Sequence, residues 1–247
     1  MRTIEDTLRM APPPTATLAD VWRQRPHPHA GTLRIRPTRP DDFAAIRELQ
    51  RVTYPAIAPW TEEQLSAQVA AFPEGQMVAE MDGRVIGASA SLVVMWDDYA
   101  VDHTWKGITG DGLFGTHEPA GRTLYGAEVV VDARRRGNGV GRALYQARRQ
   151  LCQRLNLRRI IAAGRLPGYR AVKDVMSPEL YAMRVVWGDI PDPVLRFQLS
   201  QGFHYCGVIH TYLPEDAPSC GHAALIVWLN PRHAPPRPAA LARAAAA

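Results

Sequence analysis

Three glycines, Gly137, Gly139 and Gly141, alternate with other residues between the apolar run Val129–Val131 and a helical pattern. Glycine leaves the backbone N–H groups uncovered by side chains and tolerates the positive φ angles of a tight loop. At the start of a helix these N–H groups point into one concavity, where the helix dipole favours a negative charge. The arginines Arg134–Arg136 add positive charge beside it. The segment therefore predicts a loop that binds phosphate.

Two other kinds of glycine-rich phosphate loop do not fit this spacing. A P-loop requires a glycine, four residues and then Gly-Lys-Ser or Gly-Lys-Thr, and no such lysine follows here. The dinucleotide fingerprint requires Gly-x-Gly-x-x-Gly, whereas the third glycine here follows after a single residue. The remaining pattern is Arg-x-x-Gly-x-Gly, at Arg134, Gly137 and Gly139. A structural turn with solvated arginines is the plainer interpretation, and we favour phosphate binding because the order of the surrounding elements agrees with it.

Glu128 is a carboxylate in the otherwise apolar strand that we predict over residues 123–131. Burying an unpaired carboxylate is costly, so this side chain needs a partner or a catalytic role. The sequence supports an ion pair with one of the arginines and a role as general base about equally. Side chains alternate along a strand, which places Tyr125 on the face opposite Glu128 unless a β-bulge intervenes. We expect Glu128 to be the base, with Tyr125 in the same cleft.

The elements that must position these residues follow from hydrophobic periodicity and turn residues. Strands are predicted over 33–36, 76–81, 84–96, 123–131, 158–163, 205–212 and 222–229. Helices are predicted from a Thr38 cap with Phe43, Ile46, Leu49 and Val52 on the apolar side, and over 60–72, 140–155, 178–186 and 192–201. Residues 97–121 show no period and are predicted to form a long loop. We therefore expect an α/β fold, with a mixed sheet of about seven strands and helices on both faces.

The length and composition of the chain limit which class of protein it can be. The chain has 247 residues, of which 46% are apolar, so it can bury the core of one large domain with extensions. We predict a Pro-, Arg- and His-rich arm over 1–31, the folded domain over 32–230, and a Pro- and Ala-rich tail over 231–247. No run of eighteen apolar residues occurs, and acids stand near the start where a secretory signal would be apolar. These features predict a soluble cytoplasmic protein with no membrane partner.

The net charge is +5, and lysine occurs only at Lys106 and Lys173, so arginine carries nearly all of the positive charge. The arginines are spread along the chain without a long basic run, which makes nucleic acid an unlikely partner. His204-x-Cys206 and Cys220-x-His222 have the side chains of a zinc site. The hairpin that these pairs flank would hold them roughly 20 Å apart, so we expect no metal.

The pattern Arg-x-x-Gly-x-Gly, with its strand–loop–helix context and with Gly202-Phe203 ending a later helix, resembles the acetyl-CoA motif of the GNAT superfamily. The resemblance covers nearly all of 32–230. Four further segments, Trp96–Tyr99, Asp102–Trp105, Gly164–Tyr169 and Tyr212–Asp216, are similar to the acetyltransferase domain found fused to carbon–nitrogen (nitrilase-like) hydrolases. Such a domain uses acetyl-CoA, or a close acyl-CoA, as the acyl donor and transfers the acyl group directly to an amine.

This resemblance implies a site residue by residue. The donor's pantetheine arm would pair with the backbone of Val129–Val131, and its pyrophosphate would lie on the glycine loop. The implied donor-binding residues are Val129, Val130, Val131, Arg134, Arg136, Gly137, Asn138, Gly139, Val140, Gly141 and Arg142. The implied acceptor-binding residues are His103, Trp105, His117, Arg165 and Tyr169. We expect the acceptor to be a small-molecule amine, and a homodimer is a further partner that the sequence allows.

One departure from the family pattern concerns proton transfer. Many members carry a tyrosine four residues before the Gly202 position, as acid for the departing thiolate, and this chain has Gln198 there. An amide cannot supply that proton. The donor-binding half of the motif therefore matches, whereas the proton-handling half does not. Three hypotheses remain: an acyltransferase, a catalytically inactive regulatory domain that binds CoA, and a basic RNA-associated module.

Overall fold

The computed structural model describes residues 32–99 and 101–235. The predicted N-terminal arm over 1–31 lies outside these residues, as does the end of the predicted tail, 236–247. The domain boundaries therefore stay a prediction. No helix in the described part of the chain is long and apolar enough to cross a membrane.

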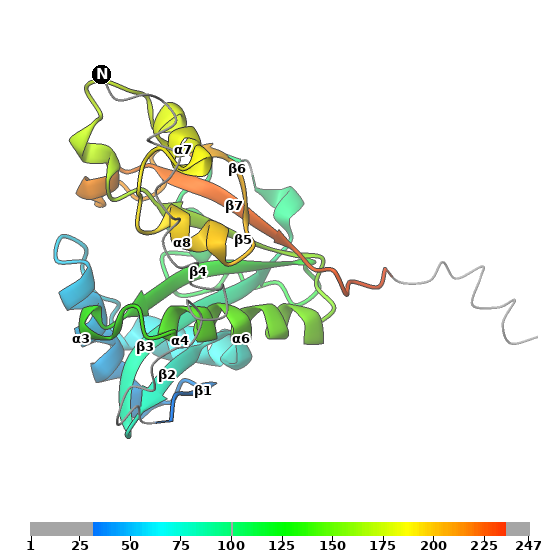
Figure 1. Ribbon diagram of the computed structural model, residues 1–247. Helices are drawn as coiled ribbons and strands as arrows, with labels where there is room; N and C mark the ends of the chain where they lie inside the picture. The colour runs from blue at the N-terminus through cyan, green and yellow to red at the C-terminus, as the bar shows by residue number, and fades with distance from the viewer. Residues whose placement is uncertain (1–31, 100, 236–247) are drawn as a thin grey trace, which may run out of the picture. The chain divides into compact units, whose positions relative to one another are not determined.

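One mixed sheet organises the described chain (Figure 1). Its strands are β1 (Arg34–Pro37), β2 (Met77–Met81), β3 (Arg84–Val94), β4 (Thr123–Val131), β5 (Arg159–Arg165), β6 (His204–Ile209) and β7 (Ala223–Leu229). They lie in the order β1-β2-β3-β4-β5-β7-β6, and all neighbours are antiparallel except β4 and β5. The parallel pair is joined by a helical crossover, as parallel strands require. The predicted seven-stranded mixed sheet is confirmed.

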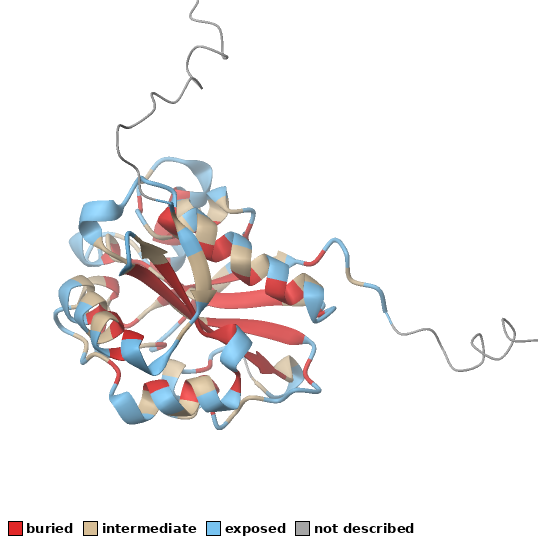
Figure 2. Ribbon diagram, turned by 90° about the horizontal axis from the view of Figure 1, so that it is seen from below, coloured by how far each residue is buried: buried red, intermediate tan, exposed pale blue. Residues whose placement is uncertain are grey.

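Helices cover both faces of this sheet, as predicted (Figure 1). The helices are α3 (Phe43–Thr53), α4 (Glu62–Ala71), α5 (Trp105–Thr109), α6 (Val140–Arg154), α7 (Pro178–Trp187) and α8 (Leu195–Ser200). One core cluster joins α3, α4 and α5 to the sheet, and another joins α6, α7 and α8 to it. Figure 2 shows the buried residues concentrated on the strands and on the helix faces turned toward them. The site described below lies in the middle of the sheet, at β4 and β5, with helices of both layers beside it.

Several predicted details of the elements were wrong. Thr38 does not cap the first helix, because a 3-10 turn over Pro40–Asp42 precedes α3 and Asp42 accepts a hydrogen bond from Arg39 N. Val52 is 57% exposed, so the apolar side of α3 ends before it. The expected loop contains α5, for which Thr104 supplies an N-cap hydroxyl. The last helix, predicted to be capped by Asp192-Pro193 and to run to Gln201, covers only Leu195–Ser200, and Asp192 Oδ1 accepts hydrogen bonds from Val194 N and Leu195 N before it.

A β-bulge interrupts β4 at its centre. Glu128 pairs with Ala90 of β3, while Gly126 pairs with Ser91, so Ala127 is an extra residue without a partner on β3. Beyond the bulge the alternation of side chains is reversed. Tyr125 and Glu128 therefore both face α3 and α4, which is the exception that the sequence analysis allowed for a β-bulge. A bulge of this kind leaves no clear trace in the sequence.

The parallel pairing of β4 with β5 stops partway along the strands. The last pair joins Gly126 to Ala162, although β4 continues to Val131 and β5 to Arg165. The two strands therefore separate in the second half of β4, immediately before the glycine loop. We call this separated part of the sheet the strand split. It exposes one backbone edge of β4 in the middle of an otherwise continuous sheet.

Candidate active site

The glycine loop joins β4 to α6 and presents its backbone to solvent. Gly137 and Gly139 have φ angles of 79° and 81°, which non-glycine residues rarely adopt. Among the described residues, no acceptor is recorded for the N–H groups of Gly137, Gly139, Val140, Gly141 and Arg142. The residues from Arg134 to Gly139 are exposed. Free N–H groups at the start of a fifteen-residue helix make a suitable cradle for a pyrophosphate.

The other predicted donor-binding residues lie in or beside this loop. Val129 and Val131 are half-buried on β4, and Val130 is buried toward α3. Arg134 pairs with Asp132, which also caps the 3-10 turn over Ala133–Arg135. The structure thus brings together the strand, the loop and the helix start that the motif predicted.

Gly141 fixes the position of this cradle against α8. A Cβ atom at Gly141 would lie 3.0 Å from Cζ of Phe197, closer than a well-packed contact allows. A side chain at this position would require the Phe197 ring to shift, so glycine lets the first turn of α6 pack closely on α8. The third glycine of the motif serves packing, whereas the first two allow the backbone of the loop to turn.

Glu128 lies half-buried just past the bulge, on the face covered by α3. Gln50 Nε2 of α3 donates a hydrogen bond of 2.5 Å to Glu128 Oε2. The amide of Gln50 is itself held in place, because its Oε1 accepts a hydrogen bond from Trp60 N at 3.0 Å. Burial raises the pKa of Glu128 to about 7, although the Gln50 hydrogen bond and the charges of Arg148 and Arg165 lower it. A carboxyl group that titrates near neutrality suits a general base.

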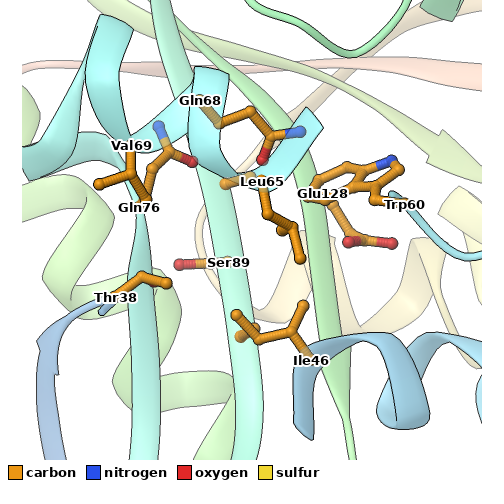
Figure 3. A pocket seen from close by; sticks show the side chains of 11 residues that line it. Thr38, Ile46, Trp60, Leu65, Gln68, Val69, Gln76, Ser89 and Glu128 are labelled. Atoms are coloured by element: carbon orange, nitrogen blue, oxygen red, sulfur yellow. The ribbon is translucent and has the colours of Figure 1, made fainter. Parts of the chain in front are cut away.

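A narrow pocket of about 10 Å³ runs from Glu128 between α3, α4 and β3. Figure 3 shows Glu128 and Trp60 at one end of the pocket and Thr38 at the other. Polar side chains line it on both sides, among them Gln68 and Ser89. A volume of this size with polar partners holds about one water molecule. Polar side chains and room for one water molecule therefore lie next to Glu128, on the side away from the strand split.

Tyr125 is fully buried, and its hydroxyl group belongs to a hydrogen-bonded chain with His103 and Tyr212. Nδ1 of His103 lies 3.0 Å from Val101 O, and Nε2 lies 2.9 Å from the Tyr125 hydroxyl. With the proton on Nδ1, Tyr125 donates to His103 and accepts from Tyr212. Burial raises the pKa of Tyr125 well above its ordinary value. Tyr125 therefore stays protonated, and its hydroxyl does not suit the role of a base.

Three further side chains meet at the strand split. Trp105 Nε1 donates to the carbonyl of Ala127 in the bulge, at 3.2 Å. The Tyr54 hydroxyl donates to Val129 O at 3.2 Å, on the backbone that the donor was predicted to use. The Arg165 guanidinium lies 4.7 Å from the centre of the Tyr54 ring and forms a bidentate ion pair with buried Asp216. Trp105 and Arg165 were predicted from the sequence, whereas Tyr54 was not.

The structure does not bring the remaining two predicted acceptor-binding residues to the split. His117 Nδ1 accepts a hydrogen bond from Val93 N, and its ring stacks on Phe72 at 4.6 Å. The Tyr169 hydroxyl donates to Met176 O, and its ring packs against Tyr181 and His222. Both side chains are engaged within the folded layers, away from the contacts of Glu128.

The cysteines show no arrangement for covalent catalysis or metal binding. Cys152 is buried on α6, and burial raises the pKa of its thiol to about 12. Cys206 and Cys220 are not joined to each other or to Cys152. Within residues 32–99 and 101–235, no group of three or more His, Cys, Asp or Glu side chains is placed to hold a metal ion.

Buried polar residues on α6 and α8 also approach the split. Arg148 was not predicted from the sequence, and Gln198 was noted there only because it replaces the family's tyrosine. Arg148 of α6 is 2% exposed and donates to Ser91 Oγ, Ala90 O and Glu128 O. Gln198 of α8 donates through Nε2 to the hydroxyl of Tyr145 on α6, at 3.1 Å. Hydrophobic periodicity does not show which polar atoms such buried polar side chains reach.

Comparisons with known proteins bear on this arrangement. A model of the acetyltransferase (GNAT) family matches residues 43–173. The "Probable hydrolase YhcX" of Bacillus subtilis is 40% identical over 201 residues, which are 81% of this chain but 39% of that protein. The "Uncharacterized N-acetyltransferase YkwB" of the same organism is 34% identical over 202 residues, covering 80% of this chain and 89% of the relative. The chain thus spans well under half of the first relative and most of the second.

Two solved structures share the fold. The GphF GNAT-like decarboxylase in complex with isobutyryl-CoA superposes with a TM-score of 0.68 at 24% identity, over 80% of this chain and 99% of that one. The loading GNATL domain of CurA from Lyngbya majuscula gives a TM-score of 0.72 at 17% identity, over 81% and 98%. At these identities the likeness concerns the fold.

Proposed function

The chain belongs to the GNAT acetyltransferase family, and from that membership we propose that it transfers the acetyl group of acetyl-CoA to the primary amine of a small molecule. Acyl transfer from a CoA thioester is the general activity that the family match supports. The observation that carries the proposal is the cradle of free N–H groups at the end of the strand split, with Glu128 beside it. The predicted cytoplasmic location stays a prediction.

The donor would lie with its pyrophosphate on the free N–H groups of Gly137 and of Gly139–Arg142 and its pantetheine arm in the strand split. Its thioester would then come next to the bulge, beside Glu128. Tyr54 already donates to Val129 O, so the arriving donor would have to displace that hydroxyl or pair with the backbone next to it. A CoA thioester fits the residues present, and the isobutyryl-CoA of the GphF structure is a bound ligand of this class.

The reaction needs no covalent enzyme intermediate. The amine nitrogen attacks the thioester carbon, a C–N bond forms, and Glu128 takes the proton that the nitrogen loses. The C–S bond then breaks, and the sulfur leaves with the electron pair as a thiolate. Glu128 suits its part because burial places its pKa near neutrality, where it is partly ionised and still basic enough to accept a proton.

The test is release of free CoA thiol from acetyl-CoA in the presence of a panel of small primary amines, with the acetylated product identified by mass. We expect amine-dependent release for at least one class of amine, and no acetyl group retained on the protein by intact mass. Tight acetyl-CoA binding without turnover on any amine would instead favour an inactive CoA-binding domain. Salt-dependent RNA binding without acetyl-CoA binding would favour the third hypothesis.

A further inference from the structure

The position of Gln198 leaves open which group protonates the departing thiolate. Gln198 is 6% exposed and stands where many members of this family carry a tyrosine. Its amide lies against β5, since a Cβ atom at Gly164 would overlap Gln198 Oε1. That Oε1 is buried and has no hydrogen-bond partner within the described residues. Its Nε2 group, in contrast, points at the hydroxyl oxygen of Tyr145.

Tyr145 has a proton to give. Among the residues that the structure describes, Gln198 Nε2 is the one hydrogen-bond partner recorded for the Tyr145 hydroxyl, and it is a donor. In this orientation of the Gln198 amide the hydroxyl oxygen accepts, and its own proton has no acceptor among the described residues. The ring is 4% exposed and is held edge-on between Phe197 and Phe203. Its orientation is thus fixed by packing before any ligand arrives.

The surroundings also stabilise the phenolate that would remain after proton transfer. The Arg148 guanidinium lies 5.6 Å from the centre of the Tyr145 ring. Burial raises the pKa of Tyr145, while Arg148, the Gln198 hydrogen bond and Arg149 act to lower it. A buried tyrosine with a neutral amide donor and nearby cations can lose and regain its proton at a fixed place.

The topology places this hydroxyl across the strand split from Glu128. The last pair of β4 and β5 is Gly126 with Ala162, and Glu128 and Gly164 each follow two residues later on their own strands. Glu128 faces α3, whereas Gly164 contacts Gln198 on the opposite face. A thioester held in the split would therefore have the carboxylate on one side and the Gln198–Tyr145 pair on the other.

We propose that Tyr145 is the proton donor to the leaving thiolate and that Gln198 is its positioning residue. This inference rests on the proposed function. As the C–S bond breaks, the sulfur takes the bonding electrons and the Tyr145 proton, which yields free CoA thiol and a phenolate. Gln198 Nε2 and Arg148 stabilise the phenolate until it recovers a proton from solvent.

The test compares Tyr145→Phe with the control variant Tyr205→Phe, which removes the hydroxyl of another tyrosine packed on the same core cluster. Single-turnover rates of acetyl transfer and acetyl-CoA affinity are measured for both. We expect Tyr145→Phe to slow transfer by about ten- to a hundredfold with nearly unchanged affinity, because a thiolate needs less acid assistance than most leaving groups. Tyr205→Phe should keep the wild-type rate.

A second variant tests the same inference if Tyr145→Phe fails to fold. With Tyr145 replaced by a difluorotyrosine, the phenol is more acidic, so the rate should begin to fall at a lower pH than in the wild type. A purely structural tyrosine would not move this alkaline limb. Wild-type rates in Tyr145→Phe, or an unmoved alkaline limb, would overturn the inference while leaving the proposed function intact. A wild-type protein that transfers to no amine would overturn both.

Discussion

At Glu128, burial and hydrogen bonding act in opposite directions on one carboxyl group. Burial disfavours the charge and raises the pKa, whereas the Gln50 amide and the more distant Arg148 and Arg165 favour the charge. The result is a pKa of about 7, which is far above that of a solvated glutamate. The group is therefore divided between its two protonation states at neutral pH.

Glu128→Gln removes the base while keeping the shape of the side chain. We expect kcat to fall by about a hundredfold or more, with acetyl-CoA affinity nearly unchanged. In the wild type the rate should rise with pH and level off above about pH 7, since the carboxylate must be ionised. That limb should be absent from the pH–rate profile of the variant. Glu63→Gln, at an exposed position of α4, is the control, and an unchanged profile in Glu128→Gln would exclude this base.

The same substitution should change stability in a pH-dependent way. Because the folded-state pKa is raised, the folded protein binds the Glu128 proton more tightly than the unfolded chain does. This contribution is fully present below pH 4.5 and is lost as the pH rises to about 7. Glu128→Gln escapes the loss, so the free energy of unfolding should gain up to about 3 kcal/mol relative to wild type between pH 4.5 and 8. Urea unfolding at both pH values measures it, and an equal difference at the two would contradict the raised pKa.

The individual site residues were predictable to different degrees. Glu128 was found because a carboxylate in an apolar strand is conspicuous. Its partner Gln50 was not, because an uncharged residue on the buried side of a helix looks like any other polar position. His103 appeared as a loop histidine, and only the folded chain shows that it is buried against Tyr125. Contacts between residues so distant in sequence are set by packing, which periodicity does not record.

Helix α6 contributes to the site at two places, its first turn and Arg148, and only the first could be predicted from the sequence. Its first turn follows the glycine loop that we propose as the cradle, and the glycine spacing predicted this loop at the start of the helix. Further along, Arg148 reaches through to β3 and β4 and donates to the carbonyls of Ala90 and Glu128, which pair with each other next to the bulge. A Cβ atom at Gly126 would lie 2.8 Å from Nη1 of Arg148, so glycine there makes room for the guanidinium. The bulge and the arginine are therefore parts of one arrangement.

Arg148→Met tests that arrangement, because methionine fills the space but cannot donate. The acceptors next to the bulge lose their buried donor, and we expect the free energy of unfolding to fall by about 2 kcal/mol. Arg148 also lowers the pKa of Glu128, so the acid limb of the pH–rate profile should move to higher pH. Urea unfolding and the pH profile measure the two effects. Arg154→Met, at an exposed position on the same helix, should produce neither effect. If the acid limb of the pH–rate profile stays in place in Arg148→Met, Arg148 does not influence the base.

For the glycine loop, two substitutions at Gly139 separate strain from charge. Its φ angle of 81° means that Gly139→Ala should cost about 1–2 kcal/mol of stability, although no atom lies within 4 Å of the new Cβ. Gly139→Glu adds a carboxylate where the pyrophosphate would lie, so acetyl-CoA binding should become undetectable by calorimetry. The alanine variant should retain measurable binding. Equal acetyl-CoA affinities in the two variants would show that the pyrophosphate does not bind at Gly139.

At the scale of the whole molecule, the order of elements and the two-sided cover of the sheet could be predicted, because hydrophobic periodicity reports which face of each element is buried. The bulge, the strand split and helix α5 could not. Each depends on a local departure from regular pairing that the average pattern conceals. These irregular features are where the candidate site lies, and the regular elements hold them in place.

The two relatives differ in length and in the activity that their names give. One of them is named as an N-acetyltransferase and has nearly the extent of this chain, and the other is named as a probable hydrolase with more than twice the matched length. Acyl transfer by the domain described here is compatible with both settings, since the cradle, the split and Glu128 all come from one continuous stretch of the chain.

A crystal structure with acetyl-CoA bound tests the central claim most directly, since that claim is a place for the donor. We predict pyrophosphate oxygens within about 3 Å of the free N–H groups of Gly137 and of Gly139–Arg142. The pantetheine arm should lie in the split beyond Gly126 and Ala162, with the thioester between Glu128 and Tyr145. Density for the donor at any other part of the chain, with the cradle occupied by solvent alone, would contradict the account.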